Sequence, residues 1–145
     1  MAGYKGATWA DQLLKLLFNA TAISNIADNA ASSPLTNLYV ALHTADPTSS
    51  GNQSSSEISY TGYARVAVAR SSGGWTVTGN AVVPAASITF GAMTAGAGGT
   101  ATFFSVGTSL SGAGELLYVG PISPTISVTN GVTPQLTPST QVTES

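Results

Sequence analysis

The sequence contains no cysteine, a single histidine, and only four basic and six acidic residues in a chain of 145 residues. Without cysteine there is no disulfide scaffold, thiol nucleophile or cysteine-based zinc site, and one histidine excludes a multi-histidine metal centre. Four basic residues and a net charge of −2 give no electrostatic footprint for nucleic acid. We therefore expect no metal, no cofactor and no nucleic-acid partner.

A long uninterrupted apolar run is also missing. The most apolar stretch near the start, residues 13–26, is broken by Lys15 and Asn19 and falls short of the ~20 apolar residues of a membrane-spanning helix. No export signal is recognisable either, so we expect a soluble protein made in the cytoplasm and no membrane partner. What the chain does contain is 43% hydrophobic residues and 38 serines and threonines, which is enough for one domain with a core.

Residues 8–18 have the pattern of a short helix, and residues 24–36, rich in asparagine, alanine and serine, predict a connector. Thr8 can cap the first turn, and Asp11 and Lys15 are spaced for an i, i+4 ion pair. An apolar stripe follows the i, i+4, i+7, i+8 spacing of an amphipathic helix and consists of Trp9, Leu13, Leu16 and Leu17. Because Leu14 and Phe18 widen the apolar face, the helix must dock, either on its own domain or on a neighbouring subunit.

From Leu38 onward the pattern is that of strands. Apolar or alternating runs at 38–43, 60–70, 75–78, 87–90, 100–106, 116–119, 126–128 and 141–143 are separated by glycine- or proline-rich turns. Residues 48–56 have no large apolar side chain and predict a mobile surface loop. This spacing favours a mostly β fold, an antiparallel sandwich or barrel with one short N-terminal helix. We expect an N-terminal helix and connector arm (residues 1–37) and a single β domain (residues 38–145).

Catalytic constellations were weighed against structural alternatives. His43 and Asp46 lie three residues apart at a strand end, which is a poor start for a catalytic triad, and no Gly-x-Ser-x-Gly elbow is present. The six carboxylates are far apart in sequence, and residues 96–99 match neither a dinucleotide fingerprint nor a P-loop. The sequence predicts a structural histidine and a protein that is not an enzyme.

Two further groups have alternative interpretations. The aromatic residues Tyr60, Tyr63 and Trp75 belong to one predicted hairpin and either stack on sugar rings or pack in the core. Arg65 and Arg70 are half of all basic residues. Each either pairs with a nearby carboxylate such as Glu57 or sits at a sheet rim, or one of them contacts another subunit.

Specific strings carry a family resemblance. LYVALHTADP at 38–47 and YTGYAR at 60–65, followed by ITF at 88–90, LLYVG at 116–120 and NGVTP at 130–134, resemble a family of small virion proteins of tailed bacteriophages. Members of that family are labelled tail-fibre-like or head-decoration proteins. The resemblance covers most of the chain, and no catalytic or cofactor motif comes with it.

The resemblance and the uncharged composition lead to one principal hypothesis. We expect a capsid cement protein on the capsid surface of the virion, a homotrimer bound to the major capsid protein through the N-terminal arm. The candidate subunit or capsid contacts are Trp9, Leu13, Leu16, Leu17, Arg65 and Arg70. The alternatives are a tail or baseplate accessory protein with tail proteins as partners, and a carbohydrate-binding module on the particle.

Overall fold

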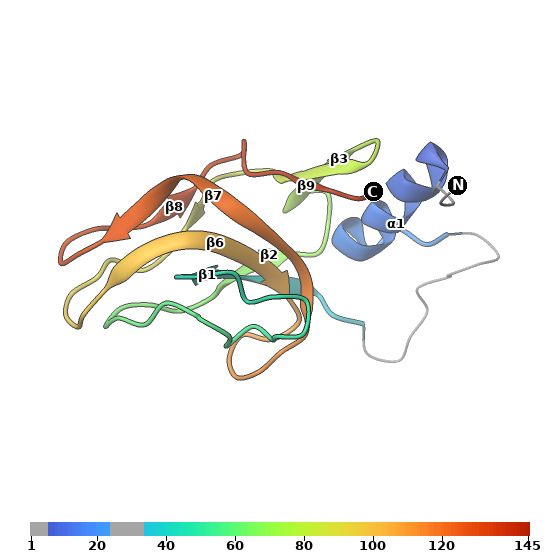
Figure 1. The fold of residues 1–145 in the computed structure, drawn as a ribbon. Helices are drawn as coiled ribbons and strands as arrows, with labels where there is room; N and C mark the ends of the chain where they lie inside the picture. The colour runs from blue at the N-terminus through green and yellow to red at the C-terminus, as the bar shows by residue number, and fades with distance from the viewer. Residues whose placement is uncertain (1–5, 24–33) are drawn as a thin grey trace.

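The computed structural model describes residues 6–23 and 34–145, and the connector predicted at 24–36 lies largely outside them. The described residues form one helix and nine strands: α1 (Ala7–Asn19), β1 (Asn37–His43), β2 (Val66–Ala69), β3 (Trp75–Thr78), β4 (Ala81–Pro84), β5 (Ile88–Thr89), β6 (Gly99–Gly107), β7 (Leu116–Val128), β8 (Gln135–Leu136) and β9 (Val142–Thr143). The predicted mostly β class with one N-terminal helix is confirmed (Figure 1).

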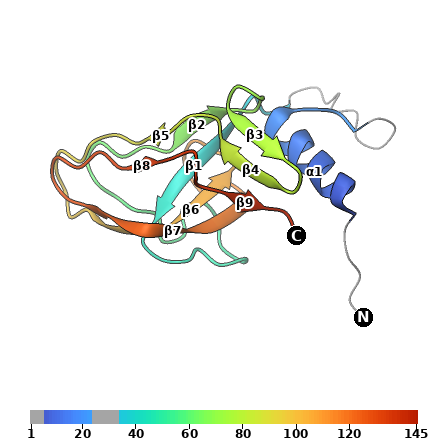
Figure 2. The same cartoon turned by 90° about the horizontal axis from the view of Figure 1, so that it is seen from above.

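Two layers of antiparallel sheet enclose the core (Figure 2). One layer is a four-stranded sheet in the order β2-β1-β6-β7, and the other consists of the sheets β3-β4-β9 and β5-β8. Alternate residues of β1, namely Leu38, Val40 and Leu42, are fully buried in the core. In register with them, Phe104 and Val106 of β6 face the same side and meet Trp75 from the second layer. The predicted antiparallel sandwich or barrel is therefore confirmed.

The opposite face of the four-stranded sheet, which we call the outer face, is covered by residues 44–65, the covering segment. The main chain of this segment follows the end of β1: the Thr44 N–H donates to Ser56 O at 2.8 Å, and the Ile58 N–H donates to Leu42 O at 2.9 Å. The predicted loop 48–56 is therefore anchored to the sheet, and its Gln53 side chain is fully buried. The absence of large apolar residues did not leave this loop detached, because turns and polar contacts hold it.

Two predicted strands have different limits in the structure. Of the strand predicted at 60–70, only Val66–Ala69 is extended, because a turn closes with the Tyr63 N–H on Tyr60 O and Gly62 adopts a φ of +104°. The strands predicted at 116–119 and 126–128 are one strand, β7, since the proline-containing part between them bulges without ending the pairing with β6. Strands β4 and β8 were not predicted.

Helix α1 packs against β3 and β4 and shares the core of the sandwich. It buries Ala10, Leu14 and Phe18, and the Phe18 ring lies 4.8 Å from that of Trp75 in an edge-on arrangement. Of the two predicted alternatives, docking on its own domain is confirmed, while contact of Trp9, Leu13, Leu16 and Leu17 with another subunit or the capsid stays a prediction. Gly6 rather than Thr8 occupies the N-cap, without a side-chain cap. The division of the chain at residues 37 and 38 stays a prediction.

Candidate functional site

The apolar stripe of α1 is divided between the core and the surface. Leu17 packs against the core cluster, whereas Trp9, Leu13 and Leu16 are only half-buried. At 100° per residue these three lie beside the buried face, so the apolar arc of the helix is about twice as wide as one docking contact requires. On the polar side, Lys15 Nζ and Asp11 Oδ2 form the predicted ion pair at 2.9 Å. We call Trp9, Leu13 and Leu16 the outer stripe of α1.

Arg70 joins the C-terminal end of α1 to the four-stranded sheet. It follows β2 directly, and its Nε and Nη2 donate to Leu17 O at 2.5 Å and Leu16 O at 2.6 Å. Its Nη1 donates to Leu35 O at 3.2 Å. The last carbonyls of a helix have no partner within the helix and carry its negative dipole end, so a guanidinium there is favourable. Arg70 therefore holds the helix on the domain.

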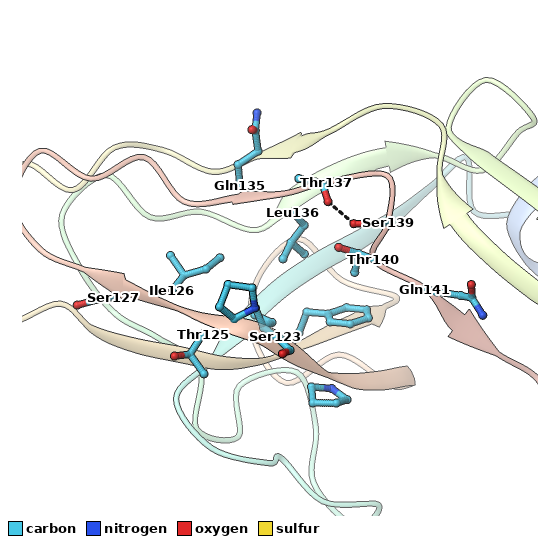
Figure 3. A pocket seen from close by; sticks show the side chains of 14 residues that line it. Ser123, Thr125, Ile126, Ser127, Gln135, Leu136, Thr137, Ser139, Thr140 and Gln141 are labelled. Carbon is cyan, nitrogen blue, oxygen red and sulfur yellow. Dashed lines mark hydrogen bonds between the residues drawn. The ribbon is translucent and has the colours of Figure 1, made fainter.

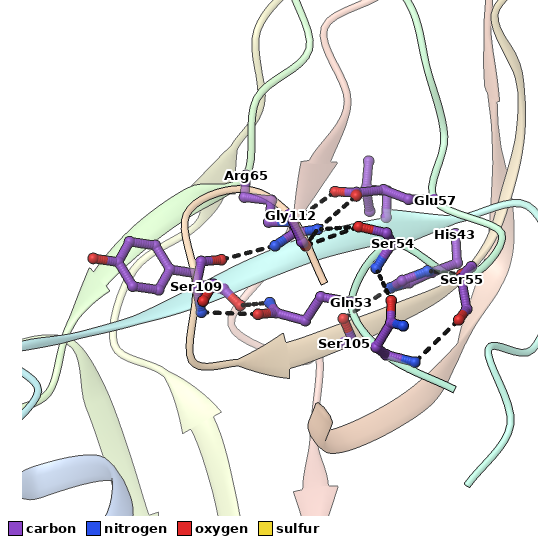
Figure 4. A network of polar contacts seen from close by, with 12 residues as sticks. His43, Gln53, Ser54, Ser55, Glu57, Arg65, Ser105, Ser109 and Gly112 are labelled. Atoms are coloured by element: carbon purple, nitrogen blue, oxygen red, sulfur yellow. Dashed lines mark hydrogen bonds and ion pairs between the residues drawn. The ribbon is translucent and has the colours of Figure 1, made fainter. Parts of the chain in front are cut away.

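Arg65 is buried in its own chain and forms the bidentate ion pair with Glu57 that was one of its two predicted alternatives (Figure 4). Its Nε and Nη2 lie 2.8 Å and 2.7 Å from the two carboxylate oxygens, and its side chain is 2% exposed. The hydrogen bonds that Arg65 donates to the Glu57 carboxylate raise the pKa of Arg65. Nη1 and Nη2 also donate to Ser109 O and Gly112 O, so all three nitrogens are engaged within the chain.

Gln53, which the sequence analysis did not single out, connects three segments under this pair. Its Nε2 donates to Tyr39 O at 3.2 Å, and its Oε1 accepts the Ser109 N–H at 2.8 Å. The amide fills space that two glycines leave open: a Cβ on Gly107 or Gly114 would come within 2.1 Å of it. The only sequence signal was these two glycines on either side of a loop, and a glycine pair alone does not identify its occupant.

His43 ends β1 and is fully buried. Its Nδ1 donates to Ser55 O at 2.8 Å, which leaves Nε2 to accept the Ser105 hydroxyl at 2.8 Å (Figure 4). Burial lowers the pKa of His43, because the charged form would lose its hydration. The pair has the atoms of a hydroxyl nucleophile and its base, but both residues are 0% exposed, so a substrate cannot reach this hydroxyl.

The aromatic residues considered for sugar stacking pack inside the molecule. Trp75 is 2% and Tyr60 8% exposed, and the Tyr60 hydroxyl donates to Gly91 O at 2.8 Å. Tyr63 stacks on Phe90 with a ring distance of 6.1 Å and donates its hydroxyl to Glu57 Oε1. Burial raises the pKa of Tyr63. Of the two alternatives given for these rings, core packing is therefore confirmed, and sugar stacking on them is not supported.

Other kinds of site are not found in the described part of the chain. Within residues 6–23 and 34–145, no three side chains of histidine, aspartate or glutamate gather as a metal site would require. Across the same residues, no helix has the length and apolar character needed to cross a membrane.

The match of residues 8–143 to a family of phage fibre proteins, together with the mostly β fold, places the chain among the structural proteins of the bacteriophage virion. Residues 8–143 match the family described as Podophage GP4 fiber I protein gp80, and the chain belongs to that family. The expected virion family and virion location are thereby confirmed at this level. No curated protein matches the sequence.

Proposed function

We propose that the chain is a fibre-type structural protein of the tail, present in several copies and attached to its neighbours through the outer stripe of α1. The observation that carries this proposal is the match of residues 8–143 to a family described as a fiber protein. It favours the tail accessory alternative over the capsid cement hypothesis, which is supported by the earlier resemblance and the weakly charged composition alone.

The surface of α1 supports the attachment. The half-buried Trp9, Leu13 and Leu16 lie together beside the docked face, and a further apolar contact would remove them from water. A homotrimer remains part of the proposal, since identical subunits in closed symmetry would cover such a patch.

A role without catalysis is also proposed. It is supported by the burial of the His43–Ser105 pair and by the internal use of Arg65, which leaves little chemistry at the surface. The use of basic residues within the chain also disfavours a role in nucleic-acid binding, because Arg65 and Arg70, two of the four basic residues, donate to groups of the same chain.

The location is tested by quantitative mass spectrometry on separated heads and tails of the purified particle. We expect the chain in the tail fraction at a small, fixed copy number per particle. Hundreds of copies in the head fraction would overturn the proposal and restore the cement hypothesis.

The attachment is tested by a variant with Trp9→Ser, Leu13→Ser and Leu16→Ser. We expect a folded protein that no longer incorporates into particles. The matched control changes the side of the same helix away from the outer stripe, Asp11→Ser and Lys15→Ser, and should incorporate normally. Normal incorporation of the first variant would show that the outer stripe is not the contact.

A further inference from the structure

The two edges of the four-stranded sheet differ in how they are protected from pairing with another chain. At the β7 edge the register with β6 shifts twice, and residues 122–125 stand opposite the single Thr102. Pro121 and Pro124 in the same strand have no N–H to donate. This irregular part of β7 and residues 135–141 line a groove of about 550 Å³ (Figure 3). Prolines and bulges are features that keep an edge strand from pairing with another chain.

The opposite edge, β2, has none of these features. It pairs with β1 in an unbroken register from Val66 to Ala69 and contains no proline and no charged residue. Together with residues 86–89, β2 lines a groove of about 260 Å³, and Figure 2 shows β2 and β5 along the same side of the sandwich. Gly73 and Gly74 also line this groove and have no side chain that would obstruct a strand. A regular edge of this kind is a template for further pairing.

The main chain of Ala67 is directed away from β1. In an antiparallel pair, residues that are hydrogen-bonded to the partner strand alternate with residues that are not. The Arg70 N–H donates to Thr36 O at 2.9 Å, so Val68 and Val66 are hydrogen-bonded to β1 as well, and Ala67 between them is not. Among residues 6–23 and 34–145, no protein group bonds the N–H or the C=O of Ala67. One donor and one acceptor are therefore available for a further strand.

The sequence of β2 is complementary to a second copy of itself. If two β2 strands run antiparallel with Ala67 opposite Ala67, these two residues exchange N–H···O=C bonds, and Val66 of each copy stands opposite Val68 of the other. The two valines are half-buried and pack against the core, whereas Ala67 is exposed on the outer face. Cross-strand pairs of β-branched side chains stabilise a sheet, and two facing alanines are too small to clash.

A small ligand fits the β2 groove less well than a strand does. Its volume lies below the ~300–1,000 Å³ of small-molecule sites, and of its lining residues only Ser87 and Thr89 have polar side chains. An added strand needs no polar side chains, because its main chain supplies the hydrogen bonds. The valines of the added strand would fill the groove from the core side.

We propose that β2 pairs with β2 of a second copy of the chain, antiparallel and with Ala67 at the centre. The two four-stranded sheets then form one continuous sheet across a two-fold axis. The contact uses no residue of the outer stripe of α1 and does not depend on the proposed function. In the proposed trimer it would lie between trimers, since a strand paired with its own copy cannot close a ring of three.

The contact is expected to be weak in solution. Four residues per copy bury far less than the ~1,200 Å² of a stable interface, so we expect a dissociation constant on the order of 0.1–1 mM. Subunits held side by side reach effective concentrations of about 1 mM, at which this contact would be occupied.

The test introduces a single cysteine into a chain that has none. In the proposed pairing the two Ala67 Cα atoms lie ~5.5 Å apart, within the range that a disulfide spans. Ala67→Cys, kept in a glutathione redox buffer near the expected dissociation constant, should therefore form a disulfide-linked dimer on a non-reducing gel. The matched control is Ala69→Cys, which is equally exposed on the same strand and face.

The proposed register separates the two variants. The two Ala69 residues are four residue steps apart along the strands, about 13 Å, which a disulfide cannot span. We expect about tenfold more dimer from Ala67→Cys than from Ala69→Cys. Equal dimer from both variants would overturn the proposal, because it would report random collisions, and so would the absence of dimer from Ala67→Cys.

A dilution series of the ¹⁵N-labelled chain tests the pairing without a disulfide. Amide signals of residues 64–71 and 86–89 should shift with protein concentration. Ala67→Pro removes the outward N–H without removing a bond to β1, so it should abolish these shifts and keep the melting temperature of the wild type. Signals that stay fixed in the wild type, or shifts that persist in Ala67→Pro, would overturn the proposal.

The pairing is also tested apart from the attachment through α1. Ala67→Cys combined with Trp9→Ser, Leu13→Ser and Leu16→Ser should form the same disulfide-linked dimer. Because this readout needs no particle, failure of the pairing is distinguishable from failure of the proposed function. Loss of the dimer in the combined variant would overturn the assignment of the contact to β2 alone.

Discussion

The two faces of the four-stranded sheet are buried in opposite ways. The core face is filled by large apolar side chains such as Leu38, Val40 and Phe104, which contact the second layer and α1. The outer face is covered by a segment poor in apolar residues. Within residues 6–23 and 34–145, the buried polar residues His43, Gln53, Arg65 and Ser105 lie on this face or in the covering segment. The first face is stabilised by area removed from water, and the second by the pairing of every polar group it buries.

This difference determines how each face responds to change. A residue lost from an apolar layer leaves a cavity, whereas a residue lost from a paired polar layer leaves donors or acceptors buried without partners. The covering segment is therefore expected to be intolerant of single substitutions and more tolerant of paired ones.

The largest effect is expected for Arg65→Met. The substitution leaves Glu57 without its cation and the carbonyls of Ser109 and Gly112 without their donor, and we expect a loss of about 3–5 kcal/mol in the free energy of unfolding. Urea unfolding followed by tryptophan fluorescence measures it. Arg65→Met with Glu57→Gln should recover part of the loss.

The matched control is the exposed ion pair of α1. Lys15→Met removes the partner of Asp11, where the lysine side chain is 42% exposed, and should cost less than about 0.5 kcal/mol. For the core face, Leu38→Ala should cost about 2–5 kcal/mol. If the Arg65 variant is as stable as the Lys15 variant, the polar contacts of the covering segment contribute little to the free energy of unfolding.

The next effect is expected for Gln53→Ala. Tyr39 O loses a donor and the Ser109 N–H loses an acceptor in a site closed to water, so we expect a loss of about 1–3 kcal/mol by the same unfolding measurement. Gln135→Ala is the control, because that exposed amide contacts only Thr89 Oγ1. Equal stability of the two variants would contradict the assigned role of Gln53.

A local effect is expected for Arg70→Met. Without the guanidinium, the carbonyls of Leu16 and Leu17 lose their donor, and we expect a cost of about 1–2 kcal/mol that falls mainly on α1. Hydrogen exchange should show faster exchange in α1 with unchanged protection in β1 and β6. Uniform loss of protection would mean that helix and sheet open as one unit. The exchange rates in α1 of Arg70→Lys should lie between those of the wild type and those of Arg70→Met.

The smallest effect is expected from the single histidine. Since the pKa of His43 is lower in the folded protein than its usual 6.5, the unfolded chain binds the proton more readily. Stability is then complete above pH 6.5 and falls as the pH drops from there through the folded pKa. Melting temperatures of the wild type should fall in this range, whereas those of His43→Gln should stay nearly level. If the melting temperatures of both proteins fall equally over this pH range, the fall is due to carboxylates and not to His43.

The sequence predicted the parts whose signals are local. The apolar run at 38–43 predicted strand β1, and the spacing of strands and turns predicted an antiparallel sandwich or barrel. The sequence predicted helix α1 but not which part of its apolar arc is buried. Both parts of the arc have helical periodicity, and the contact of Phe18 with Trp75, which determines the buried part, is visible only in the structure.

The hydrogen bonds between the covering segment and the outer face could not be predicted, because the residues they join are distant in sequence. Ser105 lies 62 residues from His43 and Ser109 lies 56 residues from Gln53, and serine is common everywhere in the chain. The pair of Arg65 and Glu57, eight residues apart, was within reach and was named among the alternatives. The groove lined by residues 122–127 and 135–141 lies between the irregular part of β7 and the segment that joins β8 to β9. No sequence periodicity indicates that these two segments lie side by side.

The attachment of α1 also gives the protein a mechanical property. A force applied at the N-terminus reaches the helix before it reaches the sheet, and the helix is held by its contacts with β3 and β4 and by Arg70. If the helix peels away and its 13 residues extend, they span about 45 Å. Pulling on the N-terminus is therefore expected to release α1 at a lower force than the one that separates β1 from β6.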